Sequence, residues 1–202
     1  MACVAWDVER TKRRIYEAAL VEFAEHGPNA TTIDRIARRA KVNRERIYNY
    51  FGDKAALFAT VVSGEVGKIA QAVPLTIASP ADAGTFAGDS YDYLRDHPEL
   101  ARLTLWEGLT SADRIVDEAS RGAVYAEKTA AVAAAQRAGL IDDRIAAPDL
   151  VFLLISLASY WAAAPHIARM LTAGADQATS ADARRAAVVH AAIQLTTPSA
   201  EA

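Results

Sequence analysis

The sequence holds one cysteine, Cys3, and its four histidines, His26, His97, His166 and His190, are scattered. A single thiol cannot form a disulfide within the chain, which is typical of proteins from a reducing compartment. The sequence has no His-x-x-x-His pair or Cys/His cluster for a metal, no glycine-rich phosphate loop and no Gly-x-Ser-x-Gly elbow. We therefore expect no metal site, no cofactor and no enzymatic activity.

Long apolar segments are also scarce. The N-terminus lacks the apolar core of a signal peptide, since charges begin at Asp7 and continue through Arg14, so we expect a cytoplasmic protein. Residues 150–168 carry no formal charge and are long enough on paper to span a bilayer. They include Ser156 and Pro165 and lack anchoring residues on both sides, which favours a helix buried in a core or a subunit interface over a membrane span.

The apolar residues that are present are mostly alanine and leucine, which favours helices. No alternating strand pattern or internal repeat is visible, so we predict an all-α fold of about nine helices. Capping residues, glycines and prolines place their boundaries. The expected helices cover about 8–26, 33–40, 44–51, 54–73, 80–96, 98–107, 112–138, 148–164 and 181–196.

The net charge of −3 is unevenly spread along the chain. Residues 1–54 contain 11 Lys/Arg and 8 Asp/Glu, whereas residues 55–202 contain 11 Lys/Arg and 17 Asp/Glu. The N-terminal part is therefore basic and the remainder acidic. A basic N-terminal part suits a polyanionic partner such as DNA, and the acidic remainder disfavours binding over the whole surface.

The segment from Thr31 to Phe58 carries the strongest motif, TTIDRIARRAKVNRERIYNYFGDKAALF. Asn43 is a candidate N-cap, so only about three residues separate two short helices, which is typical of a helix-turn-helix. This segment closely resembles the DNA-binding motif of the TetR family of transcription regulators, which implies a three-helix DNA-binding domain over residues 1–53. The matching residues are Thr31, Thr32, Ile36, Ala37, Ala40, Val42, Ile47, Tyr48, Tyr50, Phe51, Lys54, Leu57 and Phe58, together with Ile15, Ala18, Ala19, Phe23 and Gly27 of the first helix.

Six cations lie within twelve residues of this segment: Arg35, Arg38, Arg39, Lys41, Arg44 and Arg46. Exposed cations there would displace counterions from DNA phosphates, so binding should weaken with salt. Arginine and asparagine at the start of the third helix can read guanine and adenine in the major groove, and the resemblance implies phosphate contacts for a tyrosine and a lysine. The predicted DNA-binding residues are Thr32, Arg44, Glu45, Arg46, Tyr48, Asn49 and Lys54.

Two positions depart from the family pattern. Lys41 stands where the family often has glycine, so we expect a slightly strained turn. Glu45 and Arg46 stand where the family often has a small pair, and Glu45 either accepts a hydrogen bond from cytosine or repels phosphate. An operator sequence therefore cannot be transferred from a relative.

Residues 54–202 resemble the effector-binding and dimerisation part of the same family. The charge-free helix has no polar face, and the last helix has small residues at Ala187, Ala191 and Ala192 that allow close approach. We expect these last two long helices to form a homodimer interface, and two-fold symmetry then implies a palindromic operator. Alternatively, these apolar faces close the core of a monomer.

Aromatic and hydroxyl residues within the aliphatic helices are candidates for a ligand pocket, although each can equally fill the core. Trp106 is the preferred one, because Glu107 beside it could select a cation. The predicted ligand-binding residues are Tyr93, Trp106, Thr110, Tyr125, Ser156 and Tyr160, with Trp161 as a further candidate.

The sequence thus predicts a DNA-binding regulator, with repression as the family default and release from the operator by a small, mostly apolar ligand. Two alternatives remain open. One is a helical adaptor whose basic end binds an acidic protein surface, and the other is a TetR-like activator without a small-molecule ligand.

Overall fold

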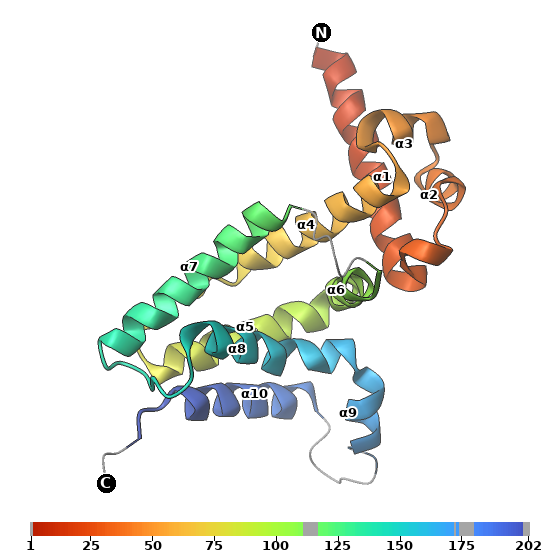
Figure 1. The fold of residues 1–202 in the computed structure, drawn as a ribbon. Coiled ribbons are helices and arrows are strands. Elements are labelled where there is room, and N and C mark those ends of the chain that lie inside the picture. The colour runs from red at the N-terminus through yellow and green to blue at the C-terminus, as the bar shows by residue number, and fades with distance from the viewer. Residues whose placement is uncertain (1, 111–116, 172, 174–179, 200–202) are drawn as a thin grey trace. The chain divides into compact units, whose positions relative to one another are not determined.

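The computed structural model describes residues 2–110, 117–171, 173 and 180–199, with side chains from residue 7 onward. These residues form ten helices and no strand, which confirms the all-α prediction (Figure 1). The predicted count of about nine was one short, because the break at Pro165 starts a separate helix. The helices are α1 (Ala2–Ala30), α2 (Ile33–Ala40), α3 (Arg44–Phe51), α4 (Lys54–Ala72), α5 (Pro80–Asp96), α6 (Pro98–Thr110), α7 (Glu118–Arg137), α8 (Ala147–Ala163), α9 (Pro165–Leu171) and α10 (Ala181–Thr196).

The helices belong to two compact units. The N-terminal unit comprises Met1–Gly67 and Glu99–Glu118, and the C-terminal unit comprises Lys68–Pro98 and Ala119–Ala202. Helix α4 runs from the first unit into the second. Helix α6 belongs to the N-terminal unit from Glu99 onward, although 31 residues (68–98) separate it from the main segment of that unit in the sequence.

An apolar stripe along α1 forms the core of the N-terminal unit. Ile15, Ala19 and Phe23 are fully buried, as their 3–4-residue spacing predicts for the inner face of a helix. The ring of Phe23 meets Phe58 of α4 edge to face, with 5.1 Å between ring centroids. Ile36 of α2, Ile47 of α3 and Leu57 of α4 are also fully buried, so one core joins the first four helices.

Helix α1 differs from the prediction at both ends. It begins at Ala2 rather than at about residue 8, so Asp7 lies inside the helix. Gly27 has φ 71° and breaks the helical geometry, as predicted, although Pro28 and the residues up to Ala30 continue as a kinked turn. The indole of Trp106 covers this kink, and a Cβ at Gly27 would lie 2.8 Å from its ring carbons, so only glycine fits there.

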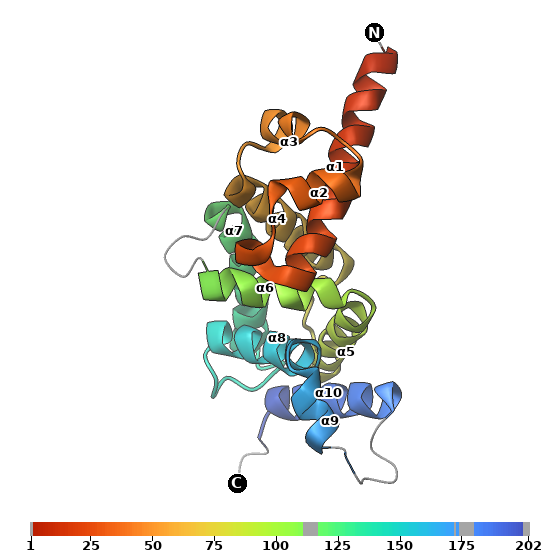
Figure 2. The same ribbon diagram turned by 90° about the vertical axis from the view of Figure 1, so that its right-hand side faces the viewer.

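The C-terminal unit is organised around α5, which packs against both α8 and α10 (Figures 1 and 2). Two glycines let α5 and α10 approach closely. A Cβ at Gly84 would lie 2.8 Å from Ile193, and one at Gly88 would lie 2.8 Å from Val189. The same contact is bridged by Arg185 of α10, which forms ion pairs with two carboxylates of α5.

The charge-free segment becomes α8 followed by α9. Among the helices that the structure describes, no single one is long and apolar enough to cross a membrane. Together α8 and α9 pass that test on length and composition, but the pair is bent by 84°. Helix α7 is described from Glu118, so its predicted start near Ala112 lies outside the described residues.

Candidate nucleic-acid interface

The helix-turn-helix is built from two capped helices. Thr32 is the N-cap of α2, where its hydroxyl oxygen accepts from the Arg35 N–H at 3.3 Å, and Asn43 caps α3 by accepting from the Glu45 N–H at 3.1 Å. Between them, the Val42 N–H donates to the Ala37 carbonyl, which closes α2 in a Schellman turn. The prediction of Asn43 as a cap is confirmed, and three residues separate the two helices.

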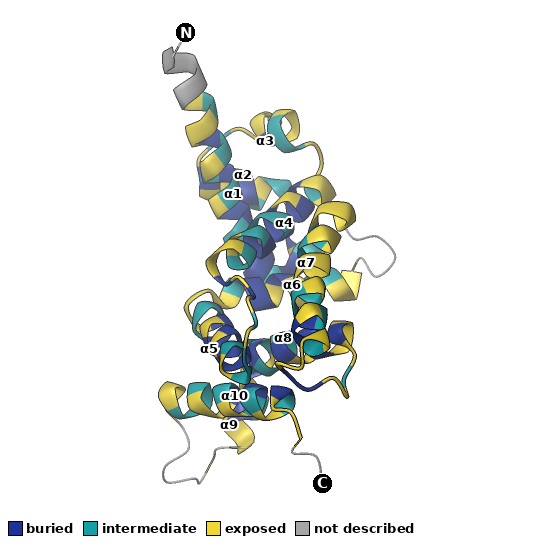
Figure 3. Ribbon diagram, turned by 90° about the vertical axis from the view of Figure 1, so that its left-hand side faces the viewer, coloured by how far each residue is buried: buried dark blue, intermediate teal, exposed yellow. Residues whose placement is uncertain are grey.

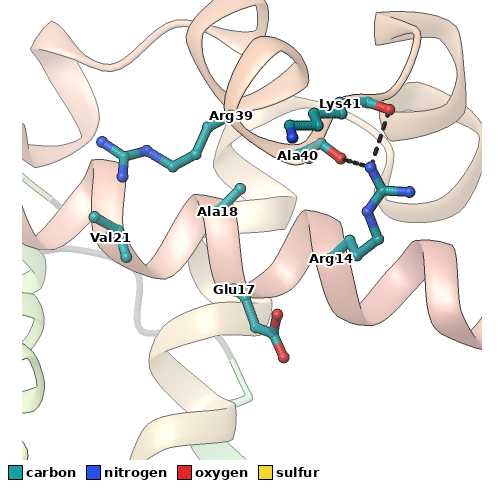
Figure 4. Close-up of a pocket in the computed structure, with 7 residues that line it drawn as sticks. All are labelled: Arg14, Glu17, Ala18, Val21, Arg39, Ala40 and Lys41. Carbon is teal, nitrogen blue, oxygen red and sulfur yellow. Dashed lines mark hydrogen bonds between the residues drawn. The ribbon is translucent and has the colours of Figure 1, made fainter.

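Lys41 occupies the left-handed conformation in this turn, with φ 52° and ψ 49°. A residue with a side chain is strained there, as the departure from glycine predicts. The guanidinium of Arg14 in α1 donates to the carbonyls of both Ala40 and Lys41, and so holds the end of α2 against α1 (Figure 4). An open groove of about 570 Å³ between α1 and α2 is lined by the cations of Arg14, Arg39 and Lys41 and the carboxylate of Glu17.

Helix α3 presents most of its side chains to solvent (Figure 3). Ile47 is fully buried and anchors the helix to the core, and Phe51 at its C-terminal end is partly covered. The opposite face is polar and exposed. It carries five of the seven predicted DNA-binding residues, Arg44, Glu45, Arg46, Tyr48 and Asn49.

A buried carboxylate that the sequence analysis missed fixes α2 against α1. Glu22 is 4% exposed, and its two carboxylate oxygens accept from Nε of Arg35 and Nε of Arg39, each at 2.7 Å. Burial acts to raise the pKa of Glu22, but the hydrogen bonds and charges of Arg39 and Arg35 outweigh it and lower the pKa. Two of the six clustered arginine and lysine side chains therefore position α2 through an ion pair with α1.

The other cations differ in their surroundings. Among the described residues, no carboxylate lies within ion-pair distance of Arg38, Lys41 or Arg46, whereas Arg44 lies 4.0 Å from Asp34 in an exposed pair. Lys54 is half-buried, and its ammonium donates to the Thr31 carbonyl at 3.0 Å, which links the start of α4 to the chain just before α2. Thr32, the remaining predicted residue, is exposed beside that link.

The predicted ligand-binding residues lie on four helices, α5, α6, α7 and α8. Trp106 packs on Gly27, and the exposed Thr110 donates its hydroxyl to the Trp106 carbonyl. Tyr93 stacks on His97 with 4.4 Å between ring centroids. The others lie on α7 and α8: Tyr125 and Tyr160, which are exposed, and the half-buried Ser156, which donates to Phe152.

Two parts of the chain match known protein families. Residues 15–61 match the bacterial regulatory proteins of the tetR family, and residues 82–193 match the tetracyclin repressor-like C-terminal domain. The chain belongs to the TetR family. The resemblance that the sequence motif suggested is thereby confirmed over the helix-turn-helix and over most of the C-terminal unit.

Relatives of known sequence support the same assignment. This TetR-family protein is 43% identical over 176 residues to the HTH-type transcriptional repressor SCO4008 of Streptomyces coelicolor. The aligned region covers 87% of this chain and 90% of that protein. It is 29% identical over 165 residues to the HTH-type transcriptional repressor NicS of Pseudomonas putida, with 78% of each chain covered. The relatives are transcriptional regulators, and the present chain is a helix-turn-helix DNA-binding regulator.

Solved structures agree with the fold. The transcriptional regulator SCO4942 from Streptomyces coelicolor superposes with a TM-score of 0.79 at 36% identity, covering 92% of this chain and 98% of that one. FadR from Bacillus subtilis, crystallised with stearoyl-CoA, has a TM-score of 0.68 at 15% identity, covering 90% of this chain and 97% of FadR. At that identity FadR bears on the fold alone.

Proposed function

We propose that this protein is a repressor that binds a palindromic operator as a homodimer and is released by a small, mostly apolar ligand. In this proposal residues 1–53 form the DNA-binding domain and residues 54–202 the effector-binding and dimerisation domain, and the protein acts in the cytoplasm. The observation that carries the proposal is the exposed polar face of α3, held on a single buried anchor, Ile47, at the end of a capped turn.

The geometry of α3 supports recognition of DNA bases by residues in its first two turns. Arg44 and Arg46 are exposed and long enough to reach guanine O6 and N7 in a major groove, and Asn49 can pair with adenine. Tyr48 is 51% exposed and is placed to donate to a phosphate. The exposed Thr32 at the start of α2 and the two remaining Lys54 donors would add phosphate contacts that fix the register on the duplex.

Exposed apolar side chains on α8 support a subunit interface. Phe152 is 70% exposed and Tyr160 is 61% exposed, and their spacing, with Ser156 between them, places all three on one helix face. On α10, the exposed residues Ala186, Ala187 and His190 form a mostly small-residue face. Faces of this kind on two copies would pack into a four-helix interface, as expected for a two-fold dimer.

Release by a ligand requires that the ligand bind the free protein more tightly than the DNA-bound one. Such coupling is reciprocal, so operator DNA would weaken ligand binding by the same factor. Equal ligand affinity with and without operator would therefore exclude ligand-induced release, while leaving the DNA-binding role intact.

Selection of bound fragments from genomic DNA tests the DNA-binding part of the proposal. The expected result is a set of fragments that share an inverted repeat, and the neighbouring genes then indicate candidate ligands. The variants Arg44→Ala and Tyr48→Phe should lose affinity for that repeat while sedimenting as intact dimers. Selection of no common sequence would contradict the proposal and favour the helical adaptor, whereas binding of the repeat by a monomer would contradict the homodimer.

A further inference from the structure

A small cavity lies within the C-terminal unit where α5, α8 and α10 meet. Its volume is about 130 Å³, and its lining includes Tyr91, Leu94 and Arg95 of α5, Ala158 and Trp161 of α8, and Arg184 of α10. This volume corresponds to about four water molecules and is well below the range of about 300–1,000 Å³ that is typical of sites for drug-sized ligands. Only a compact molecule fits.

Arg184 in this cavity has an unmet hydrogen-bonding group. Its Nε is buried and has no acceptor in the structure. Its guanidinium carbon lies 5.6 Å from the centroid of the Trp161 ring, within the range of a cation–π contact, so the ring holds the group in place without accepting its N–H. Buried N–H groups normally have a partner, and this one lacks an acceptor.

The charges around the cavity show what kind of acceptor is missing. Arg95 is paired with Asp92 at 2.8 Å and with Asp96 at 2.9 Å, and Arg185 is paired with Asp92 at 2.5 Å. No carboxylate of the described residues lies within ion-pair distance of Arg184, which is therefore the cation without a countercharge at this place. An anionic oxygen would supply both the charge and the acceptor.

We propose that this cavity binds a compact oxyanion, namely a carboxylate, phosphate or sulfate group, through the guanidinium of Arg184. The planar N–H edge of arginine matches such a group, and the Trp161 ring keeps that edge in position. Beside the two arginines, Leu94, Ala158 and the ring of Tyr91 supply an apolar part of the wall that suits a short hydrocarbon attached to the oxyanion. This inference goes beyond the proposed function, because it holds whether or not the anion regulates DNA binding.

Thermal unfolding of the full chain in sodium acetate, phosphate or sulfate tests the site, with ionic strength held constant by replacing sodium chloride. A ligand that binds only the folded state raises the melting temperature with the logarithm of its concentration above Kd, by about 5–10 °C at a hundredfold excess over Kd. Arg184→Gln should abolish the rise, and Arg184→Lys should weaken it, because lysine keeps the charge but lacks the planar edge. Arg137→Gln, an exposed arginine of the same unit, is the matched control and should keep the full rise.

Fluorescence provides a second readout. Trp161 is one of three tryptophans, and an anion bound beside it should change the emission in the wild type but not in Trp161→Phe. A purely structural role for Arg184 would lower the melting temperature of Arg184→Gln in every buffer and leave no anion-dependent rise in the wild type, which would overturn the proposal. A second result would also overturn the proposal: no response of the wild type to any of the anions, together with weaker dimerisation of Arg184→Gln. The acceptor for Arg184 would then belong to a second copy of the chain.

Discussion

The buried carboxylate of Glu22 leads to a prediction that separates helix positioning from DNA contact. Glu22→Gln keeps the size of the side chain and one acceptor oxygen, but removes the charge that holds Arg35 and Arg39. Because both hydrogen bonds are 2.7 Å long and charge-assisted, their loss should be measurable in the free energy of unfolding.

The magnitude follows from the burial of the three groups. Hydrogen bonds to charged groups contribute about 1.5–3 kcal/mol each, and removing one partner of a fully buried ion pair costs about 3–5 kcal/mol. Here the arginine side chains are 40% and 43% exposed, so water can solvate them once the carboxylate is gone. We expect Glu22→Gln to lower the free energy of unfolding by about 2 kcal/mol, or the melting temperature by about 4–8 °C.

The dependence on pH has a definite sign. The pKa of Glu22 is lowered in the folded protein, because the hydrogen bonds and charges of Arg39 and Arg35 outweigh the raising effect of burial. A carboxyl group with a lowered folded-state pKa contributes stability above its ordinary value of 4.5, and this stability is lost as the pH falls through the lowered value. The difference between wild type and Glu22→Gln should therefore be largest near neutral pH and shrink below pH 4.5.

Urea unfolding followed by circular dichroism, at one protein concentration and in steps from neutral pH to about pH 3, measures this difference. Glu25→Gln is the matched control, because Glu25 is 48% exposed and lies 3.6 Å from Arg39, so its removal should cost less than about 1 kcal/mol. Equal stability of Glu22→Gln and wild type at neutral pH, or a difference that stays constant as the pH falls, would refute the reasoning.

Two further substitutions test the packing. Lys41→Gly should raise the free energy of unfolding by up to about 1 kcal/mol in the same urea assay, because it relieves the left-handed φ of 52°, and a decrease would contradict the strain at this turn. Gly88→Ala should lower the free energy of unfolding by about 1–3 kcal/mol, because the new Cβ would lie 2.8 Å from Val189. The control Gly67→Ala places its Cβ in open space and should be neutral or stabilising. Equal effects of the two substitutions would argue against close packing of α5 on α10.

Local signals in the sequence predicted the N-terminal unit well. The apolar stripe of α1, the cap at Asn43, the break at Gly27 within α1 and the glycine after α3 act within a few residues, so their pattern indicates each helix independently of the rest of the chain. The exposed face of α3 follows from the same pattern, because Ile47 is its one fully buried residue.

The features that the sequence did not reveal depend on pairing between distant segments. The sequence does not show that Arg35 and Arg39 pair with Glu22, because the contact forms only when α1 and α2 pack together. No spacing rule links positions 22 and 39. Trp106 of α6 packs on Gly27, almost eighty residues earlier, and the spacing within either helix gives no sign of this contact. Whether an aromatic side chain lines a pocket or covers a glycine depends on tertiary contacts that periodicity within one helix does not specify.

In the proposed function, a symmetric dimer presents two copies of α3 to successive turns of one duplex face. The most direct test measures the affinity of the wild-type protein for its selected inverted repeat and for the same repeat with about five base pairs inserted at the centre, which turns one half-site to the opposite face of the DNA. The insertion should reduce the affinity of the dimer to that for a single half-site. Undiminished affinity for the lengthened repeat would contradict this proposal.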